Sequence, residues 1–246
     1  MEQLCIQSYL AQGYPVHLYC YNKLEGVPEG ATIRDGREIL PAEEIFSYRS
    51  GPGKDSIAAF ADFFRYKLLL EHGGWWSDLD VVCLRRLDFQ ELHVVGQQRS
   101  PNSSPQANGG LIKAPAGSPL MSYCWDACQA IDKGTLRWGE IGPDLLDRAI
   151  EDSNVPVHVL APQVFHPIDY WDFLQLVGNS ELPKDAYSIH LWHEKWRRKQ
   201  LDPDGQYPPT CIYEQLKRRF GVVAPQTVSK RKGNVVLLLK KFLGAK

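Results

Sequence analysis

The sequence predicts an α/β domain in which helices flank a central, mainly parallel β-sheet. Apolar runs of strand length alternate with segments of helical periodicity through most of the 246 residues. Clusters of glycine and proline separate these segments and mark the turns between them. Because strands that alternate with helices form parallel sheets, ligands are expected at the carboxyl ends of the strands.

The composition is that of an ordinary globular protein. Hydrophobic residues make up 43% and charged residues 23% of the sequence. Neither a signal peptide nor an apolar run of transmembrane length is evident, so we expect a cytoplasmic protein. The cysteines show no C-x-x-C spacing and are expected to be buried thiols rather than zinc ligands: Cys5, Cys20, Cys83, Cys124, Cys128 and Cys211.

The end of the chain differs from the rest in charge. The net charge is −1, but the residues from Gln215 onward include Lys and Arg and no Asp or Glu. We therefore expect one domain over residues 1–221, which does not bind nucleic acid, and a basic tail over 222–246. Because basic residues flank the apolar run 235–239, the tail is expected to contact an anionic inner membrane surface. A disordered solubilising tail and a helix packed on the domain are the alternatives.

The N-terminal part predicts a helix closed by glycine, a buried strand, a short strand and a short helix, at residues 2–12, 15–21, 31–34 and 41–48. A longer helix follows, because Ile57, Phe60, Phe64 and Leu68 recur at helical spacing. The helix ends at Gly73, since glycine accepts the conformation of a C-cap.

The part after Gly74 predicts mostly strands, with helices only at residues 118–132, from 142 onward and at 212–220. Residues 99–107 are polar and rich in serine and proline, and are therefore expected to form a loop. The expected strands are 75–84, 92–97, 108–114, 155–160 and 188–193.

Two aspartates lie within the strand predicted at residues 75–84. Alternate residues of a strand share a face, so Asp78 and Asp80 should point the same way. Paired carboxylates with little basic charge beside them favour a hard divalent cation, Mg²⁺ or Mn²⁺. Taken alone, however, the tripeptide also fits a solvated strand end.

Asp62 and Arg65 lie three residues apart on the preceding helix and therefore share a face. They can present a hydrogen-bond acceptor beside a planar donor group to a ligand. A surface salt bridge, which contributes little stability, is the alternative.

The whole run, D-x-x-R-Y-x-x-L-x-x-x-G-G-x-x-x-D-x-D, resembles a glycosyltransferase family described by its sugar-binding region containing the DXD motif. Polysaccharide and lipopolysaccharide α-glycosyltransferases belong to that family. The residues that carry the resemblance are Asp62, Arg65, Tyr66, Leu69, Gly73, Gly74, Asp78 and Asp80. The resemblance implies the GT-A fold, a nucleotide-sugar donor and retention of anomeric configuration.

The resemblance also implies the roles of individual residues. Asp78, Asp80 and Arg65 are the expected catalytic residues, and Asp78, Asp80 and His190 the expected metal ligands. The expected substrate contacts are Asp62, Arg65, Tyr66, Trp76, Asn108, Gly109, Gly110, His190 and Trp192.

For two groups of these residues, a purely structural role is the alternative. Gly109 and Gly110 permit close approach of a ligand to the backbone but also suit a plain turn. His190 and Trp192 share a strand face, and His193 lies on the other face or at the start of a loop. Either histidine suits a metal or a phosphate, and either could be a satisfied core residue; the core alternative is the stronger for His193.

The expected function is a metal-dependent retaining glycosyltransferase of hexosyltransferase type. It would move a sugar to a saccharide or lipid-linked acceptor in polysaccharide or lipopolysaccharide synthesis. A degenerate, non-catalytic sugar-nucleotide-binding protein and a metal-dependent phosphohydrolase are the competing functions.

One family feature is missing from the sequence. Family members generally begin with a strand of apolar-Trp-ϕ-Gly pattern before the helix that starts here at Glu2. Without it, the strand at residues 15–21 should have an empty neighbouring sheet position, and nucleotide binding and solubility should be weak. Either the chain is a degenerate form, or Met1 is an internal methionine mistaken for the start, which we consider the better explanation.

Overall fold

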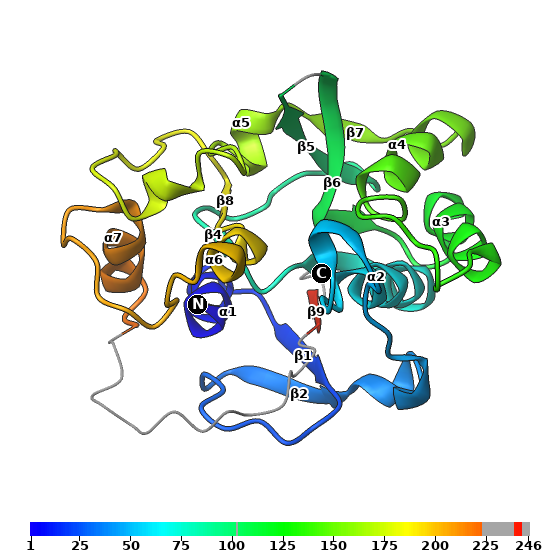
Figure 1. Ribbon diagram of the computed structural model, residues 1–246, viewed down its shortest axis with the longest axis horizontal. Helices are drawn as coiled ribbons and strands as arrows, with labels where there is room; N and C mark the ends of the chain where they lie inside the picture. The colour runs from blue at the N-terminus through cyan, green and yellow to red at the C-terminus, as the bar shows by residue number, and fades with distance from the viewer. Residues whose placement is uncertain (102, 223–238, 243–246) are drawn as a thin grey trace.

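A seven-stranded sheet with helices on both faces forms the centre of the fold, and a two-stranded sheet lies beside it (Figure 1). The structure is a computed structural model that describes residues 1–101, 103–222 and 239–242. The α/β class predicted from the sequence is therefore confirmed.

The seven strands of the large sheet run in two directions. The pairings give five strands one direction, whereas β6 and β9 run the opposite way. Most strands thus run the same way. Because β6 and β9 are inserted between them, however, most neighbouring pairs are antiparallel. In spatial order the strands are β2 (Ala31–Asp35), β1 (Val16–Cys20), β9 (Leu239–Phe242), β3 (Gly74–Ser77), β6 (Ser103–Ala114), β5 (Val94–Ser100) and β7 (His158–Leu160).

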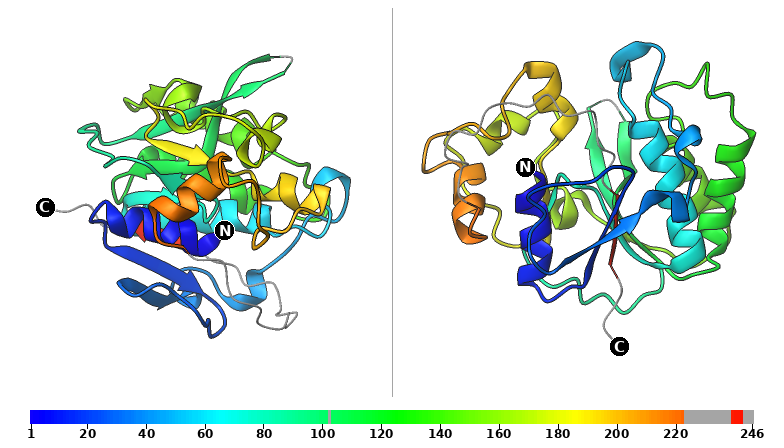
Figure 2. Two further views of the ribbon diagram at one scale, coloured as in Figure 1. Left: turned by 90° about the vertical axis from the view of Figure 1, so that its left-hand side faces the viewer. Right: turned by 90° about the horizontal axis from the view of Figure 1, so that it is seen from below.

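The helices are divided between the two faces of this sheet (Figure 2). Those that pack on one face are α2 (Ala58–His72), α3 (Pro119–Ala130) and α4 (Pro143–Asp152). Those on the other face are α1 (Glu2–Ala11) and α5 (Pro162–Phe165). A third hydrophobic cluster packs on one face of the two-stranded sheet. That sheet consists of β4 (Val81–Cys83) and β8 (Ser188–His190), and the cluster includes residues of α6 (His193–Lys199) and α7 (Ile212–Arg219).

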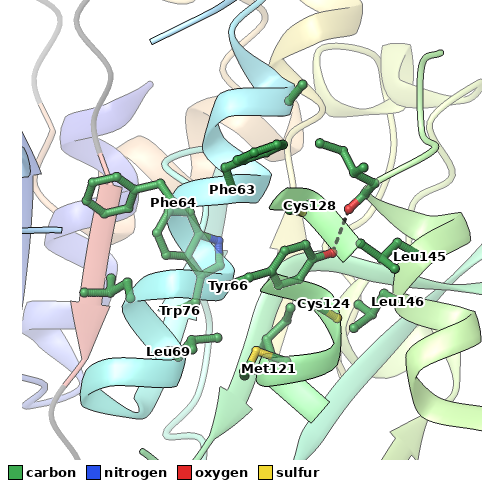
Figure 3. Packing of buried hydrophobic residues seen from close by; sticks show 14 of the residues in the cluster. Phe63, Phe64, Tyr66, Leu69, Trp76, Met121, Cys124, Cys128, Leu145 and Leu146 are labelled. Carbon is green, nitrogen blue, oxygen red and sulfur yellow. Dashed lines mark hydrogen bonds between the residues drawn. The ribbon is translucent and has the colours of Figure 1, made fainter. Parts of the chain in front are cut away.

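The sheet is buried on both faces, because consecutive residues of a strand point into the hydrophobic clusters on its two opposite faces. In β3, Trp75 packs with the α1 side and Trp76 with the α2 side. Figure 3 shows Trp76 beside Phe64 of α2, with Tyr66 facing α3. All six cysteines are also buried, as predicted.

The strand predicted at residues 75–84 is two strands. β3 ends at Ser77, and the chain turns through Asp78 to Asp80 before β4 begins at Val81 in the other sheet. Asp78 and Asp80 therefore do not share a strand face, and the alternation argument for their convergence was wrong.

Three further expectations need correction. The loop predicted at residues 99–107 lies largely in the β5–β6 hairpin, because cross-strand pairing overrides the polar composition. The helix predicted at residues 41–48 is a single 3₁₀ turn, Ala42–Glu44. The strand predicted at 188–193 ends at His190, and α6 begins at His193.

The sheet position beside β1 that the sequence left empty is occupied. β9 lies between β1 and β3 and is antiparallel to both, with Lys241 opposite His17 and Trp76. Leu239–Phe242, which were expected to contact a membrane, are thus a strand of the central sheet; the basic run 230–232 lies outside the described residues. Within the described residues, no helix has the length and apolar character needed to cross a bilayer.

This pairing predicts that proline at position 241 destabilises the fold. Proline removes a backbone N–H from the middle of a sheet, so Lys241→Pro should lower the unfolding free energy by about 1–3 kcal/mol. Lys241→Ala keeps the N–H and serves as the control. Urea denaturation of the full chain checks the difference, and equal stability of the two variants would contradict the pairing of β9.

Candidate active site

The site is centred on a buried pair of side chains from one face of α2. Nη1 of Arg65 donates a hydrogen bond of 2.5 Å to Oδ1 of Asp62, and the exposed fractions of these residues are 5% and 8%. The alternative of a weak surface salt bridge is therefore excluded. A side-chain carbon at Gly109 would overlap Nη1 of Arg65, so glycine is needed there.

The same guanidinium connects α2 to the turn after β3. Nη2 of Arg65 donates to Oδ1 of Asp78 at 2.7 Å, and Nε1 of Trp76 donates to the same oxygen at 2.7 Å. The Arg65 guanidinium carbon also lies 5.1 Å from the centre of the Trp76 ring, in cation–π contact. Asp78 is thus fixed in orientation by two donors from different elements.

Burial and charge perturb the pKa values of this group. Burial, with a further contribution from the Asp78 carboxylate, raises the pKa of Asp62 to about 7, although Arg65 acts in the opposite direction. Burial tends to lower the pKa of Arg65, but Asp78 and Asp62 raise it above its ordinary value. The guanidinium therefore stays charged between two carboxylates.

Asp80 lies in the turn that leads into β4. Residues at and just after the end of β8 form hydrogen bonds with it. Its Oδ2 accepts a hydrogen bond of 2.9 Å from the backbone N–H of His193 and lies 3.2 Å from Nε2 of His190. Its carbonyl accepts the backbone N–H of Leu191 at 2.7 Å. Burial opposes ionisation, but the charge of His190 and the hydrogen bonds from His190 and His193 to the carboxylate hold the pKa of Asp80 well below its ordinary value.

Asp78, Asp80 and His190 together form a possible metal site. Each offers one ligand atom, and these atoms lie within 4.8 Å of one another. Two carboxylates and a neutral imidazole suit Mn²⁺, and the carboxylates also suit Mg²⁺. The residues present therefore fit the divalent cation that the DXD motif suggests.

A bulge in β6 brings backbone next to these groups. Val95 pairs with Ile112 but Gly96 pairs with Asn108, so the intervening residues of β6 leave the ladder with β5, while Leu111 still pairs with Ser77 of β3. Oδ1 of Asn108 accepts the N–H of Gly110 at 2.7 Å, and the carbonyl of Gly110 accepts the N–H of Asp78 at 2.7 Å. A plain turn is thus excluded for this segment.

His190 is stacked on the ring of Trp192, although β8 ends at His190 and the strand face predicted for the two residues does not exist. The two ring centres are 3.8 Å apart at an interplanar angle of 19°. His166 lies beside this stacked pair, with its ring centre 5.4 Å from that of His190 and 6.0 Å from that of Trp192. Burial and nearby His190 hold the pKa of His166 well below its ordinary value, so its ring is neutral.

Some predicted substrate contacts do not line the site. Tyr66 is fully buried, and its hydroxyl donates to the carbonyl of Ile141 at 2.9 Å (Figure 3), so it is a core residue. Trp76 is also buried, and its contribution to the site is the hydrogen bond that its Nε1 donates to Asp78. The amide of Asn108 is engaged at both ends, because its Nδ2 donates to Oε1 of Gln98 at 2.5 Å and its Oδ1 accepts from Gly110, so it shapes the site through the backbone.

Two residues lie at the site where the sequence did not place them. Gln98 fixes the amide of Asn108 but lies in a segment read as the edge of a loop. Gly142 precedes α4, and a side-chain carbon there would lie 3.3 Å from Oδ2 of Asp62. Gly142-Pro143 favoured the start of a helix over a contact with phosphate or sugar, and did not predict that Gly142 lies beside Asp62.

A family model agrees with the resemblance in the sequence. Residues 28–100 match the family model described as "Glycosyltransferase sugar-binding region containing DXD motif". The matched residues include Asp62, Arg65, Asp78 and Asp80, so this part of the chain is similar to the sugar-binding region of that glycosyltransferase family.

A solved structure, "PaToxG Glycosyltransferase", is also similar to this chain. It is 17% identical, with a TM-score of 0.37, over 51% of this chain and 48% of that one. The match thus spans about half the length of each chain. No curated protein matches the sequence.

The raised pKa of Asp62 predicts that the unfolding free energy depends on pH. Between about pH 4 and pH 7 the folded chain binds a proton at Asp62 that the unfolded chain has lost, so this contribution to the unfolding free energy falls as pH rises. Asp62→Asn removes it. The stability of the variant relative to the wild type should therefore increase from pH 5 to pH 8, as measured by urea denaturation. A pH-independent difference would contradict the raised pKa.

Proposed function

We propose that this protein is a metal-dependent, retaining glycosyltransferase that moves a hexosyl unit from a nucleotide-sugar donor to an acceptor hydroxyl. One observation carries the proposal. The Arg65 guanidinium joins the buried carboxylate of Asp62 to the first aspartate of the DXD motif. Groups suited to a sugar thus lie directly beside groups suited to a metal diphosphate.

Asp62 and Arg65 would orient the sugar of the donor. A buried carboxylate accepts hydrogen bonds from sugar hydroxyls, and a guanidinium has five N–H donors, of which the two carboxylates occupy only some. Nε of Arg65 is buried without a partner among the described residues. Because both carboxylates hold the guanidinium, the donor would meet a preorganised surface.

Asp78, Asp80 and His190 would hold the divalent cation. When bound, that cation supplies positive charge against the diphosphate leaving group. Hydrogen bonds from Trp76 and Arg65 to Asp78, and from His193 to Asp80, would keep the two carboxylates turned toward it.

The transfer itself requires no separate protein nucleophile. The bond between the anomeric carbon and the phosphate oxygen breaks, and a bond from the anomeric carbon to the acceptor oxygen forms on the same face. The leaving phosphate takes the proton of the acceptor hydroxyl. Retention follows from this geometry.

The acceptor class is a saccharide or a lipid-linked saccharide, and residues 1–221 would contain the machinery. A thermal-shift screen of nucleotide sugars with Mn²⁺ identifies the donor, because a ligand that binds only the native state raises the unfolding temperature. Turnover of that donor with and without acceptor then tests the proposal. Transfer requires the acceptor, whereas donor consumption independent of any acceptor would indicate a hydrolase.

The metal ligands predict loss of transfer in Asp80→Asn. The amide keeps the size of the side chain but removes the charge, so transfer should fall at least a hundredfold while the fold is retained. EDTA should abolish the activity and Mn²⁺ should restore it. Asp88→Asn, at an exposed position, is the control. Undiminished turnover in EDTA would exclude the metal mechanism.

The orienting role predicts a large effect of Arg65→Lys. Lysine keeps the charge but cannot bridge Asp62 and Asp78 with a planar group, so transfer should fall by a factor of ten or more. Arg148→Lys, at an exposed position on α4, should have no effect. Initial rates at saturating donor measure both variants, and wild-type rates for Arg65→Lys would remove Arg65 from the mechanism.

A further inference from the structure

A pair of buried imidazole rings lies behind the candidate metal ligands. The exposed fractions of His166 and His190 are 1% and 7%. Nδ1 of His190 and both ring nitrogens of His166 have no hydrogen-bond partner among the described residues. Buried polar atoms are normally paired, and three unpaired nitrogens on two adjacent rings therefore require an explanation.

The fold fixes His166 at this place. On one side of it, the Ser188 hydroxyl donates to the carbonyl of Phe165 at 2.9 Å. On the other side, Nε1 of Trp192 donates to the carbonyl of Ile168 at 2.8 Å. Both donors come from the segment that carries His190, so the two histidines are held against each other by hydrogen bonds that flank them.

The two nitrogens of His190 face different surroundings. Nε2 lies 3.2 Å from Asp80, among the candidate metal ligands, and Nδ1 is the unpaired atom. A histidine that binds a metal through Nε2 carries its proton on Nδ1, and that N–H almost always donates to an outer partner. With ring centres 5.4 Å apart, a nitrogen of His166 is within reach, either after a small ring rotation or through one water molecule.

We propose that His166 is a positioning residue that accepts a hydrogen bond, directly or through one water molecule, from Nδ1–H of His190. This bond holds His190 in the tautomer whose Nε2 can bind the divalent cation. The inference rests on the proposed metal-dependent function and adds to it a residue that does not itself contact metal or donor.

Metal binding by the full chain tests this role without any activity measurement. Mn²⁺ titrations followed by electron paramagnetic resonance give the affinity of the wild type, His166→Phe and His166→Gln. Loss of an outer partner typically weakens metal affinity 10–100-fold, which is the expected effect of phenylalanine. Glutamine keeps an acceptor oxygen and should retain more of the affinity.

Packing effects are separated by a control variant and by unfolding temperatures. Val164→Ala alters the apolar packing of the same segment without touching either imidazole and should bind Mn²⁺ as the wild type does. Added Mn²⁺ should raise the unfolding temperature of the wild type and of Val164→Ala more than that of His166→Phe. A merely structural role would lower the unfolding temperature without changing this metal-induced rise. If His166→Phe does not fold, His166→Leu replaces it.

Two results would overturn the inference, and they can be told apart. If the wild type binds Mn²⁺, Asp80→Asn does not, and His166→Phe binds with wild-type affinity, the role of His166 is refuted while the metal site stands. If the wild type itself binds no Mn²⁺, the metal-dependent function and the role of His166 fail together.

Discussion

The hydrogen bonds of the Arg65 guanidinium are the interaction on which the rest of the site depends. They connect a helix that packs on one face of the large sheet to the turn where the chain leaves that sheet. A buried arginine is tolerated only with paired carboxylates, and removing one partner leaves an uncompensated charge. Asp62, Asp78 and the glycine at position 109 are thus constrained together by one planar group.

The site is assembled at the boundary between two sheets. Asp78 follows the last residue of β3, while Asp80 precedes β4, which pairs with β8 through Val81 and His190. A cation held by these three side chains would therefore brace the two sheets against each other. Binding energy there would stabilise the relative position of two cores as well as orient a donor.

How far the sequence predicted this site depends on how local each signal was. The i, i+3 spacing of Asp62 and Arg65 correctly placed them on one helical face, because helix geometry is fixed by neighbouring residues. The convergence of Asp78 and Asp80 was predicted correctly, but from strand alternation that does not exist there. β9 depends on partners distant in sequence, which local propensity does not encode. The β5–β6 hairpin is held by cross-strand pairing that its polar composition does not reveal. Nothing in the sequence indicated that His166 lies beside His190, because the two residues are far apart along the chain.

The turn between β3 and β4 gives the spacing of the DXD motif a geometric meaning. Only three residues carry the chain from one sheet to the other, and the carbonyl of Asp80 is already paired with Leu191. An added residue would shift β4 by one step against β8 and turn its buried side chains to the opposite face. The distance between the sheets thus fixes the length of the motif, whereas the half-buried side chain of Leu79 between the two aspartates is less constrained.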